Sequence, residues 1–122
     1  MVEDDPSVRQ LAVRLLQSLG YATVAAADAD TALQVLENTP AVTLLFSDVV
    51  LPGGRNGVAL AREARRRRPA LKVLLTSGYT EQNLLPQDRA EAGFAFLSKP
   101  YHRAQLASRL QALLGNGAQH EV

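Results

Sequence analysis

The sequence predicts an α/β domain in which helices cover both faces of a parallel sheet. The chain has 122 residues, the size of one ordinary domain with a single hydrophobic core. Short apolar runs rich in Val, Leu and Phe alternate along it with longer segments of helical period, which is typical of βα units. VTLLFS at residues 42–47 forms one such apolar run. It indicates a strand that is covered on both faces.

Composition indicates a soluble protein with an aliphatic core. Hydrophobic residues make up 47% of the chain, charged ones 20% and aromatic ones 5%, and there is no Trp. The formal charge of +1 gives the molecule no overall attraction for nucleic acid. The absence of Cys excludes disulfides and thiolate sites. No apolar stretch approaches the roughly 20 residues that span a bilayer and no signal-peptide pattern is present, so we expect a cytoplasmic location without membrane insertion.

Four consecutive arginines, Arg65 to Arg68, form the longest run of like charge. They lie at the end of a predicted helix, where the helix dipole favours cations, and no aromatic residues alternate with them. We interpret the run as a solvated helix end, and we expect no direct contact with nucleic acid.

Five βα units are predicted, and the first begins with a truncated strand. Only Met1 and Val2 precede the acidic residues at 3–5, whereas a typical strand has about five or six residues. Residues 6–19 are predicted to form a helix that Asp5 caps. The inward positions of this helix, at i, i+3, i+4, i+7 spacing, are Val8, Leu11, Ala12, Leu15 and Leu19.

The remaining units repeat this alternation. Residues 21–26 are predicted to be a short strand, and a helix follows over 28–38 with Asp28 or Asp30 as its cap. Further strands are predicted over 42–47, 71–77 and 94–99, and further helices over 57–69 and 103–117. The third of the predicted helices would bury Leu60, Ala61 and Ala64, and the last would bury Leu106, Leu110 and Leu113.

Two segments depart from this regular pattern. Pro86 would interrupt a helix between residues 78 and 93, so a short or irregular fourth helix is expected there. The tail at 116–122 is predicted to be disordered, which leaves one domain over residues 1–115.

Polar residues follow the predicted strands where they end. In a parallel α/β sheet the carboxyl ends of the strands meet at one edge, and ligands bind there. Carboxylates that gather in one place repel each other unless a cation joins them, and Mg²⁺ prefers such oxygen ligands. A lysine and hydroxyls could hold further negative oxygens, so the set is suited to phosphoryl transfer. Its members are Glu3, Asp4, Asp48, Thr76, Ser77 and Lys99.

Four motifs in this order resemble the response-regulator receiver domain of two-component systems, over nearly the whole chain. They are VEDD at 2–5, SDVVLPGGRNG at 47–57, LLTSGY at 74–79 and LSKPY at 97–101. The long GGRN connection and the short tail are similar to the C-terminal receivers of hybrid sensor histidine kinases. The resemblance implies a flavodoxin-like, doubly wound (βα)5 sandwich with parallel strand order 2-1-3-4-5.

The resemblance also implies a metal site and an acceptor. Asp48 would accept a phosphoryl group from the phosphohistidine of a histidine kinase or a phosphotransfer protein. Asp4 would bind Mg²⁺ directly and Glu3 through water, and Asp48 with the backbone carbonyl of Val50 would complete the protein ligands.

Further roles follow for the residues after the last two predicted strands. Thr76 and Ser77 would contact phosphoryl oxygens and Lys99 would pair with another oxygen, and the bond from Lys99 to Pro100 would be cis. Phe96 corresponds to the aromatic switch residue. Its reorientation would change the face formed by the fourth helix, the fifth strand and the fifth helix.

Some residues differ from the commoner family pattern. Phe96 lacks the hydroxyl of its tyrosine counterpart, and we expect it to face the opposite side of its strand from Phe94. Val50 and Gly78 leave the mouth of the site without an additional polar side chain, which would set the lifetime of the acyl phosphate.

Two other functions are compatible with the pattern. One is a pseudo-receiver that binds other proteins without phosphorylation. The other is a Mg²⁺-dependent phosphohydrolase, but those enzymes carry a second acid two residues after the nucleophile, where this chain has Val50. We therefore do not expect an enzyme that acts on other molecules, only one that catalyses its own phosphorylation and dephosphorylation. A weak homodimer is left open.

Overall fold

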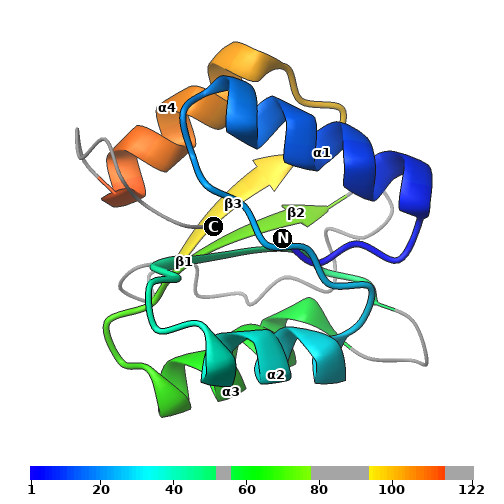
Figure 1. Ribbon diagram of the computed structural model, residues 1–122. Coiled ribbons are helices and arrows are strands. Elements are labelled where there is room, and N and C mark those ends of the chain that lie inside the picture. The colour runs from blue at the N-terminus through cyan, green and yellow to red at the C-terminus, as the bar shows by residue number, and fades with distance from the viewer. Residues whose placement is uncertain (52–55, 78–93, 115–122) are drawn as a thin grey trace.

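A computed structural model describes residues 1–51, 56–77 and 94–114 (Figure 1). Within these residues, three parallel strands form a sheet in the order β1 (Leu44–Asp48), β2 (Lys72–Ser77) and β3 (Phe94–Ser98). The predicted irregular helix around Pro86, the predicted disordered tail and the turn at 52–55 lie outside the described residues.

Val2 extends the pairing beyond β1 on one side. It forms parallel bridges to both Ala26 and Ser47, and its N–H donates to the Phe46 carbonyl at 2.8 Å. Val2, in the predicted first strand, therefore lies between the predicted second strand and β1, which is the predicted third strand. This placement agrees with the order 2-1-3-4-5. Residues 21–26 form no regular strand: they contain isolated bridges at Ala22 and Ala26, and Met1 and Val2 of the truncated first strand lie beside them.

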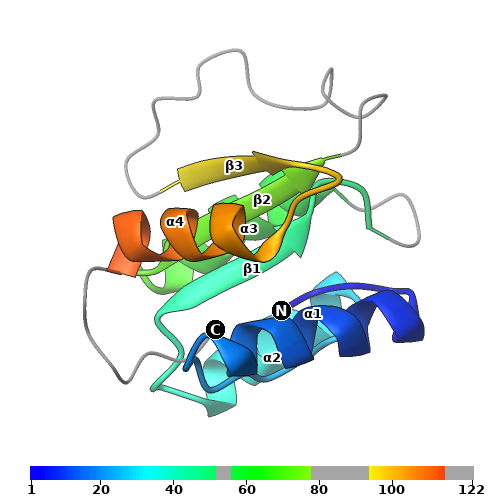
Figure 2. The same ribbon diagram turned by 90° about the horizontal axis from the view of Figure 1, so that it is seen from above.

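Within the described residues, two helices cover each face of the sheet (Figures 1 and 2). α1 (Pro6–Ser18) and α4 (Arg103–Leu114) lie on one face, and α2 (Ala29–Asn38) and α3 (Gly57–Arg67) lie on the other. The chain is thus a doubly wound α/β sandwich, as predicted. Each face has its own buried cluster: Leu16, Phe46, Leu74, Leu106 and Leu110 beneath α1 and α4, and Leu36, Leu45, Ala61, Val73 and Leu75 beneath α2 and α3.

Side-chain caps begin the helices that follow the carboxyl edge. Asp5 Oδ1 accepts backbone N–H groups of the first turn of α1 at 2.8 and 3.3 Å, with Pro6 at the first position. Of the two candidate caps for α2, the structure shows Asp28, which accepts an N–H at 2.8 Å. Asn56 caps α3 in the same way at 2.7 Å. These caps end the loops of this edge and fix where each helix starts.

The prediction for the buried face of α1 is wrong at two positions. Val8 and Leu11 are 44% and 69% exposed, whereas Ala12 and Leu16 are buried. The first turns of α1 extend beyond the arrowheads of the strands, so the sheet does not lie beneath them (Figures 1 and 2). Among the described residues, none of the helices has the length and apolar character needed to cross a membrane.

The arginine run is solvated only in part. Arg66 and Arg67 are exposed and pair with Glu63. Arg68, by contrast, crosses to the loop between α2 and β1, so its interpretation as a solvated residue is wrong. Its guanidinium donates to the carbonyl of Val42 at 3.0 Å and to two carbonyls near the end of α2. The guanidinium satisfies carbonyl oxygens that the end of a helix leaves without partners.

Phe94 and Phe96 share one face of β3. Both pack against the cluster beneath α2 and α3, while Ala95 packs against the other cluster. The expectation that the two aromatic residues face opposite sides is therefore wrong, since side chains two positions apart on a strand point the same way.

Candidate functional site

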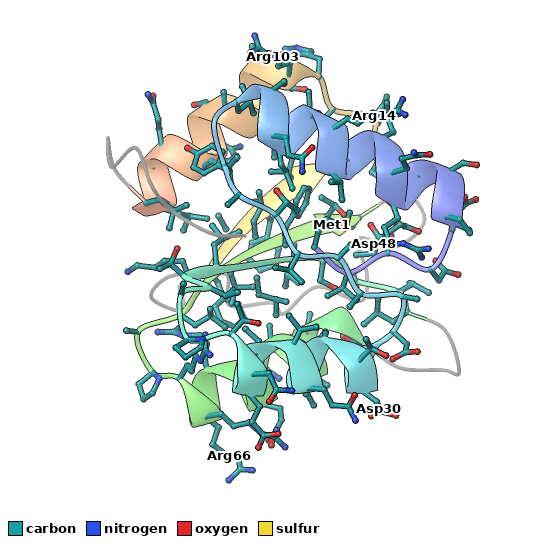
Figure 3. The ribbon with its side chains drawn as sticks, viewed as in Figure 1. Met1, Arg14, Asp30, Asp48, Arg66 and Arg103 are labelled. Atoms are coloured by element: carbon teal, nitrogen blue, oxygen red, sulfur yellow. The ribbon has the colours of Figure 1, made fainter. Side chains whose placement is uncertain are left out.

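Asp48 is the last residue of β1 and lies in the sheet's carboxyl edge (Figure 3). It is only 7% exposed. The parallel register places it beside Thr76 of β2, whose hydroxyl Oγ1 donates to Asp48 Oδ1 at 2.5 Å. The ammonium Nζ of Lys99 lies 2.7 Å from the same oxygen. One buried carboxylate thus receives a hydroxyl from the end of β2 and a cation from the residue after β3.

Two further acids converge on Asp48. Glu3 is buried and Asp4 is exposed, and one carboxylate oxygen from each of the three residues lies within 4.8 Å of the others. Oxygens that bind one Mg²⁺ at about 2.1 Å lie no more than about 4.2 Å apart, so this spacing suits direct carboxylate ligands together with one acid that binds through water. The donor chemistry and spacing of these residues fit a hard divalent cation.

The two buried acids of the site titrate in opposite directions. Burial raises the pKa of Glu3 to about 8, and its hydrogen bond to Asp48 and the charge of Asp48 add to the rise. Burial alone would also raise the pKa of Asp48, but hydrogen bonds from Glu3, Lys99 and Thr76 outweigh it and lower that pKa. Glu3 therefore holds a proton at neutral pH, and Asp48 is the ionised acid, as a nucleophile must be.

Gly57 allows α3 to begin directly against the acceptor. A Cβ atom at this position would lie 1.9 Å from the backbone carbonyl oxygen of Asp48. The Gly57 N–H donates to the carbonyl of Val49 at 2.6 Å, and the Val49 N–H donates to Thr76 at 2.9 Å. Only a residue without a side chain permits this approach. The backbone on both sides of the Asp48 carbonyl is therefore fixed to α3 and β2.

Val50 lies at the rim of the site. It forms an antiparallel bridge with Asn56, which closes the loop after β1, and its side chain is 43% exposed. The rim is apolar at this point, as expected from the sequence. The role of the Val50 carbonyl as a metal ligand stays a prediction.

Lys99 is held by the end of the sheet. Its backbone N–H donates to the carbonyl of Ser77 at 2.9 Å, which continues the ladder one residue past β3, and its bond to Pro100 is cis. Ser77 itself is buried at the next position after Thr76, so strand alternation directs its side chain to the other face. The structure thus brings Thr76 and Lys99 to Asp48 but not the Ser77 side chain. The role of Phe96 as a switch stays a prediction.

Two residues at the site were not identified from the sequence. Tyr101 packs its ring on Phe46, with centroids 6.1 Å apart, and burial raises its pKa to about 12, with a contribution from the charges of Asp48 and Glu3. Arg9 donates to the backbone beside the acids. The available signals were an aromatic residue directly after Lys-Pro and a base in the first turn of a helix.

Comparisons with known proteins agree with this geometry. The family model of the response regulator receiver domain matches residues 1–111. The sensor kinase CckA of Brucella abortus is 39% identical over 115 residues, which are 93% of this chain but 12% of CckA. The response regulator receiver protein CpdR of the same organism is 31% identical, and the match covers 93% of both chains. The chain therefore spans a small part of the first relative and nearly all of the second.

Solved structures show the same relationship. The receiver domain of the hybrid histidine kinase CckA has a TM-score of 0.75 and 35% identity, and the match covers 93% of this chain and 94% of that one. The receiver domain of NtrX from Brucella abortus has a TM-score of 0.83 and 29% identity, with 95% and 97% covered. A receiver domain protein from Clostridium thermocellum, at 18% identity, shares the fold with a TM-score of 0.84. The chain belongs to the response regulator receiver domain family of two-component systems and has the flavodoxin-like fold.

Proposed function

We propose that Asp48 is the phosphoacceptor of this domain and takes its phosphoryl group from the phosphohistidine of a histidine kinase or phosphotransfer protein. The observation that carries the proposal is the contact of one buried, ionised carboxylate with Thr76 Oγ1 at 2.5 Å and Lys99 Nζ at 2.7 Å. Two further acids lie beside it. Family membership supports the same role.

The chemistry is a transfer between two nucleophiles. A carboxylate oxygen of Asp48 attacks phosphorus and the P–N bond to the donor imidazole breaks, and its electron pair stays on the imidazole nitrogen, which takes up a proton from water. The product is an acyl phosphate. Thr76 Oγ1 and Lys99 Nζ already lie within hydrogen-bonding distance of the acceptor. They would move their contacts to phosphoryl oxygens and stabilise the charge of the transition state.

The acids would hold the cofactor of this transfer. Asp4 and Asp48 would bind the ion directly and Glu3 would bind it through water, and the Val50 carbonyl would complete the protein ligands. A bound Mg²⁺ would neutralise charge on the carboxylates and on the transferred group. Because Glu3 has a pKa raised to about 8, its carboxyl group would give up a proton when the ion binds.

The test is to incubate the protein with Mg²⁺ and acetyl phosphate and to measure its intact mass. We expect the mass of one added phosphoryl group, lost in Asp48→Asn and when Mg²⁺ is replaced by a chelator. Acetyl phosphate removes the need to know the kinase. An unlabelled wild type, under conditions that label a control receiver, would contradict the proposal and favour the pseudo-receiver that binds without phosphorylation.

The proposal extends to the output of the domain. Phosphorylation would draw Thr76 toward the phosphoryl group and reorient Phe96, and so change the surface around β3 and α4 that partners bind. The domain would act on no other substrate, and it would work in the cytoplasm beside its kinase. Beryllofluoride, a stable mimic of the phosphoryl group, should shift the amide NMR signals of β3 and α4 in the wild type but not in Asp48→Asn.

A further inference from the structure

Arg9 makes an unusual set of contacts beside the acidic pocket. It lies in the first turn of α1 and is half-buried. Its Nη1 donates to the backbone carbonyl of Glu3 at 2.9 Å and to that of Asp4 at 3.4 Å. Among the described residues, it forms no ion pair with the carboxylates of Glu3, Asp4 or Asp48. The guanidinium therefore binds the backbone of the acids and leaves their side-chain oxygens available.

The stability of α1 does not explain an arginine at this position. The first turn is the positive end of the helix dipole, where a cation is unfavourable. The helix already has its cap in Asp5, which accepts two N–H groups of the first turn. The contacts of Arg9 with the preceding loop are the favourable interactions that remain.

These contacts add to the hydrogen bonds of the loop at residues 3–5. The Glu3 N–H donates to Ala26 at 3.0 Å, the Asp5 N–H donates to Glu3 Oε1 at 3.1 Å, and the Arg9 N–H donates to the Asp5 carbonyl at 2.8 Å. The Arg9 side chain donates hydrogen bonds to the carbonyl oxygens of Glu3 and Asp4. Because the orientation of a peptide plane fixes the direction of the side chains on either side of it, Arg9 helps to set where both carboxylates point.

We propose that Arg9 is a positioning residue of the metal site: it holds the backbone of Glu3 and Asp4 so that their carboxylates converge with Asp48. The inference rests on the proposed function, because the ion that these acids would share is the Mg²⁺ of that proposal. The direction in which Mg²⁺ affinity changes when Arg9 is replaced separates a positioning role from an effect of its charge. Removing a cation beside a Mg²⁺ site strengthens binding by Coulomb's law, whereas loss of positioning weakens it.

The test is a Mg²⁺ titration of the wild type, Arg9→Met and Arg14→Met, followed by amide NMR. Arg14 is the matched control, because it lies on the same helix with an exposed side chain (Figure 3). We expect Arg9→Met to bind Mg²⁺ about tenfold more weakly than the wild type, as for other residues that orient metal ligands. Arg14→Met should bind with unchanged affinity. An unchanged or increased affinity in Arg9→Met would overturn the inference, even if its melting temperature falls.

A second variant keeps the test decisive if Arg9→Met does not fold. Arg9→Lys keeps the charge, but its ammonium is one bond short of the guanidinium nitrogen that reaches the carbonyls. A weaker affinity for Mg²⁺ in this variant supports positioning, and an affinity equal to that of the wild type overturns it. Suppose that the wild type binds Mg²⁺ and is labelled at Asp48, and that Arg9→Met binds Mg²⁺ equally well. The positioning role of Arg9 would then be wrong, while the proposed function would stand. A wild type that binds no Mg²⁺ would end the proposed function as well.

Discussion

The two edges of the sheet each hold a cation, but the cations have different partners. At the amino edge, the Arg68 guanidinium donates to neutral backbone carbonyls, among them Val42 at 3.0 Å and Thr39 at 2.9 Å. At the carboxyl edge, the Lys99 ammonium contacts the carboxylate of Asp48, beside Glu3 and Asp4. Arg68 connects parts of the fold, whereas Lys99 meets a cluster whose charge it only partly balances.

This difference shows one charged residue that stabilises the fold, Arg68, and one that belongs to the functional site, Lys99. Carbonyl oxygens at a helix end carry partial charge, so Arg68 completes their hydrogen bonding and leaves no group that needs a ligand. At the other edge, three carboxylates against one ammonium leave two negative charges when all are ionised. A cluster of that kind is unfavourable until protons or a metal ion join it. Substitutions at the two edges should therefore change different properties.

The largest effect is expected from Lys99→Met, which should slow the labelling of Asp48 by acetyl phosphate. Loss of one preorganised donor to a developing oxyanion costs about 10²- to 10³-fold in rate. Stability should also fall, because the buried Asp48 carboxylate loses its cation, so the rate is compared at temperatures where the variant is folded. Labelling rates come from intact mass against time, with Lys72→Met as the control. A variant that is labelled normally but melts much earlier would reverse the comparison.

At the amino edge, Arg68→Met should lower the free energy of unfolding by about 2–3 kcal/mol, since carbonyl oxygens near α2 lose a charged donor. Labelling of Asp48 should keep its wild-type rate at temperatures where the variant is folded. Urea unfolding measures the first quantity. Arg66→Met, at an exposed position of the same run, is the matched control and should unfold like the wild type. Equal free energies of unfolding for the two variants would show that the Arg68 contacts do not stabilise the fold.

Affinity of the acidic edge for Mg²⁺ is expected to depend on pH through Glu3. Because the pKa of Glu3 is raised to about 8, it is protonated below that pH and must lose its proton before Mg²⁺ binds fully. Affinity for Mg²⁺ should rise about tenfold per pH unit up to pH 8 and then level off. Calorimetry in two buffers of different ionisation enthalpy would count the proton released. Glu3→Gln should remove the pH dependence, and a flat wild-type profile between pH 6.5 and 8.5 would refute it.

The smallest effect is expected at the rim. Val50→Asn would place a polar group where water approaches the acyl phosphate, so the phosphoryl group should be lost several-fold faster. Decay of the phosphorylated mass after removal of the donor gives the lifetime. Val8→Asn introduces the same change at another exposed valine and should leave the lifetime as it is. An identical lifetime in Val50→Asn would show that this rim does not control access of water.

The sequence was sufficient for the layers of the fold and for the central part of the site. Apolar runs followed by polar residues marked the strand ends, and the geometry of parallel strands then brought Asp48, Thr76 and Lys99 to one edge. Caps were partly readable, because Asp5 acts on the turn that follows it directly and Asp28 was one of two candidates for the cap of α2. Both signals are local, so neither requires knowledge of distant contacts.

Other features depend on contacts that the sequence does not display. Arg68 looks like its three neighbours in the run, and its partners lie 26 to 32 residues away. Val8 and Leu11 have helical spacing, but both are exposed in the structure. The protonation of Glu3 depends on tertiary burial. Ser77 differs, since strand alternation after Thr76 could have placed it on the other face.

The position of Tyr101 makes the domain readable by spectroscopy. The sequence has three Tyr and no Trp, so replacing tyrosine with fluorotyrosine gives a fluorine spectrum with few signals. The Tyr101 ring packs on Phe46, and it lies close enough to Asp48 and Glu3 for their ionised forms to raise its pKa. Because its pKa is raised to about 12, it stays neutral over the working range of pH. Its fluorine resonance would therefore report changes of charge at the acceptor in real time, without a bulky label at the site.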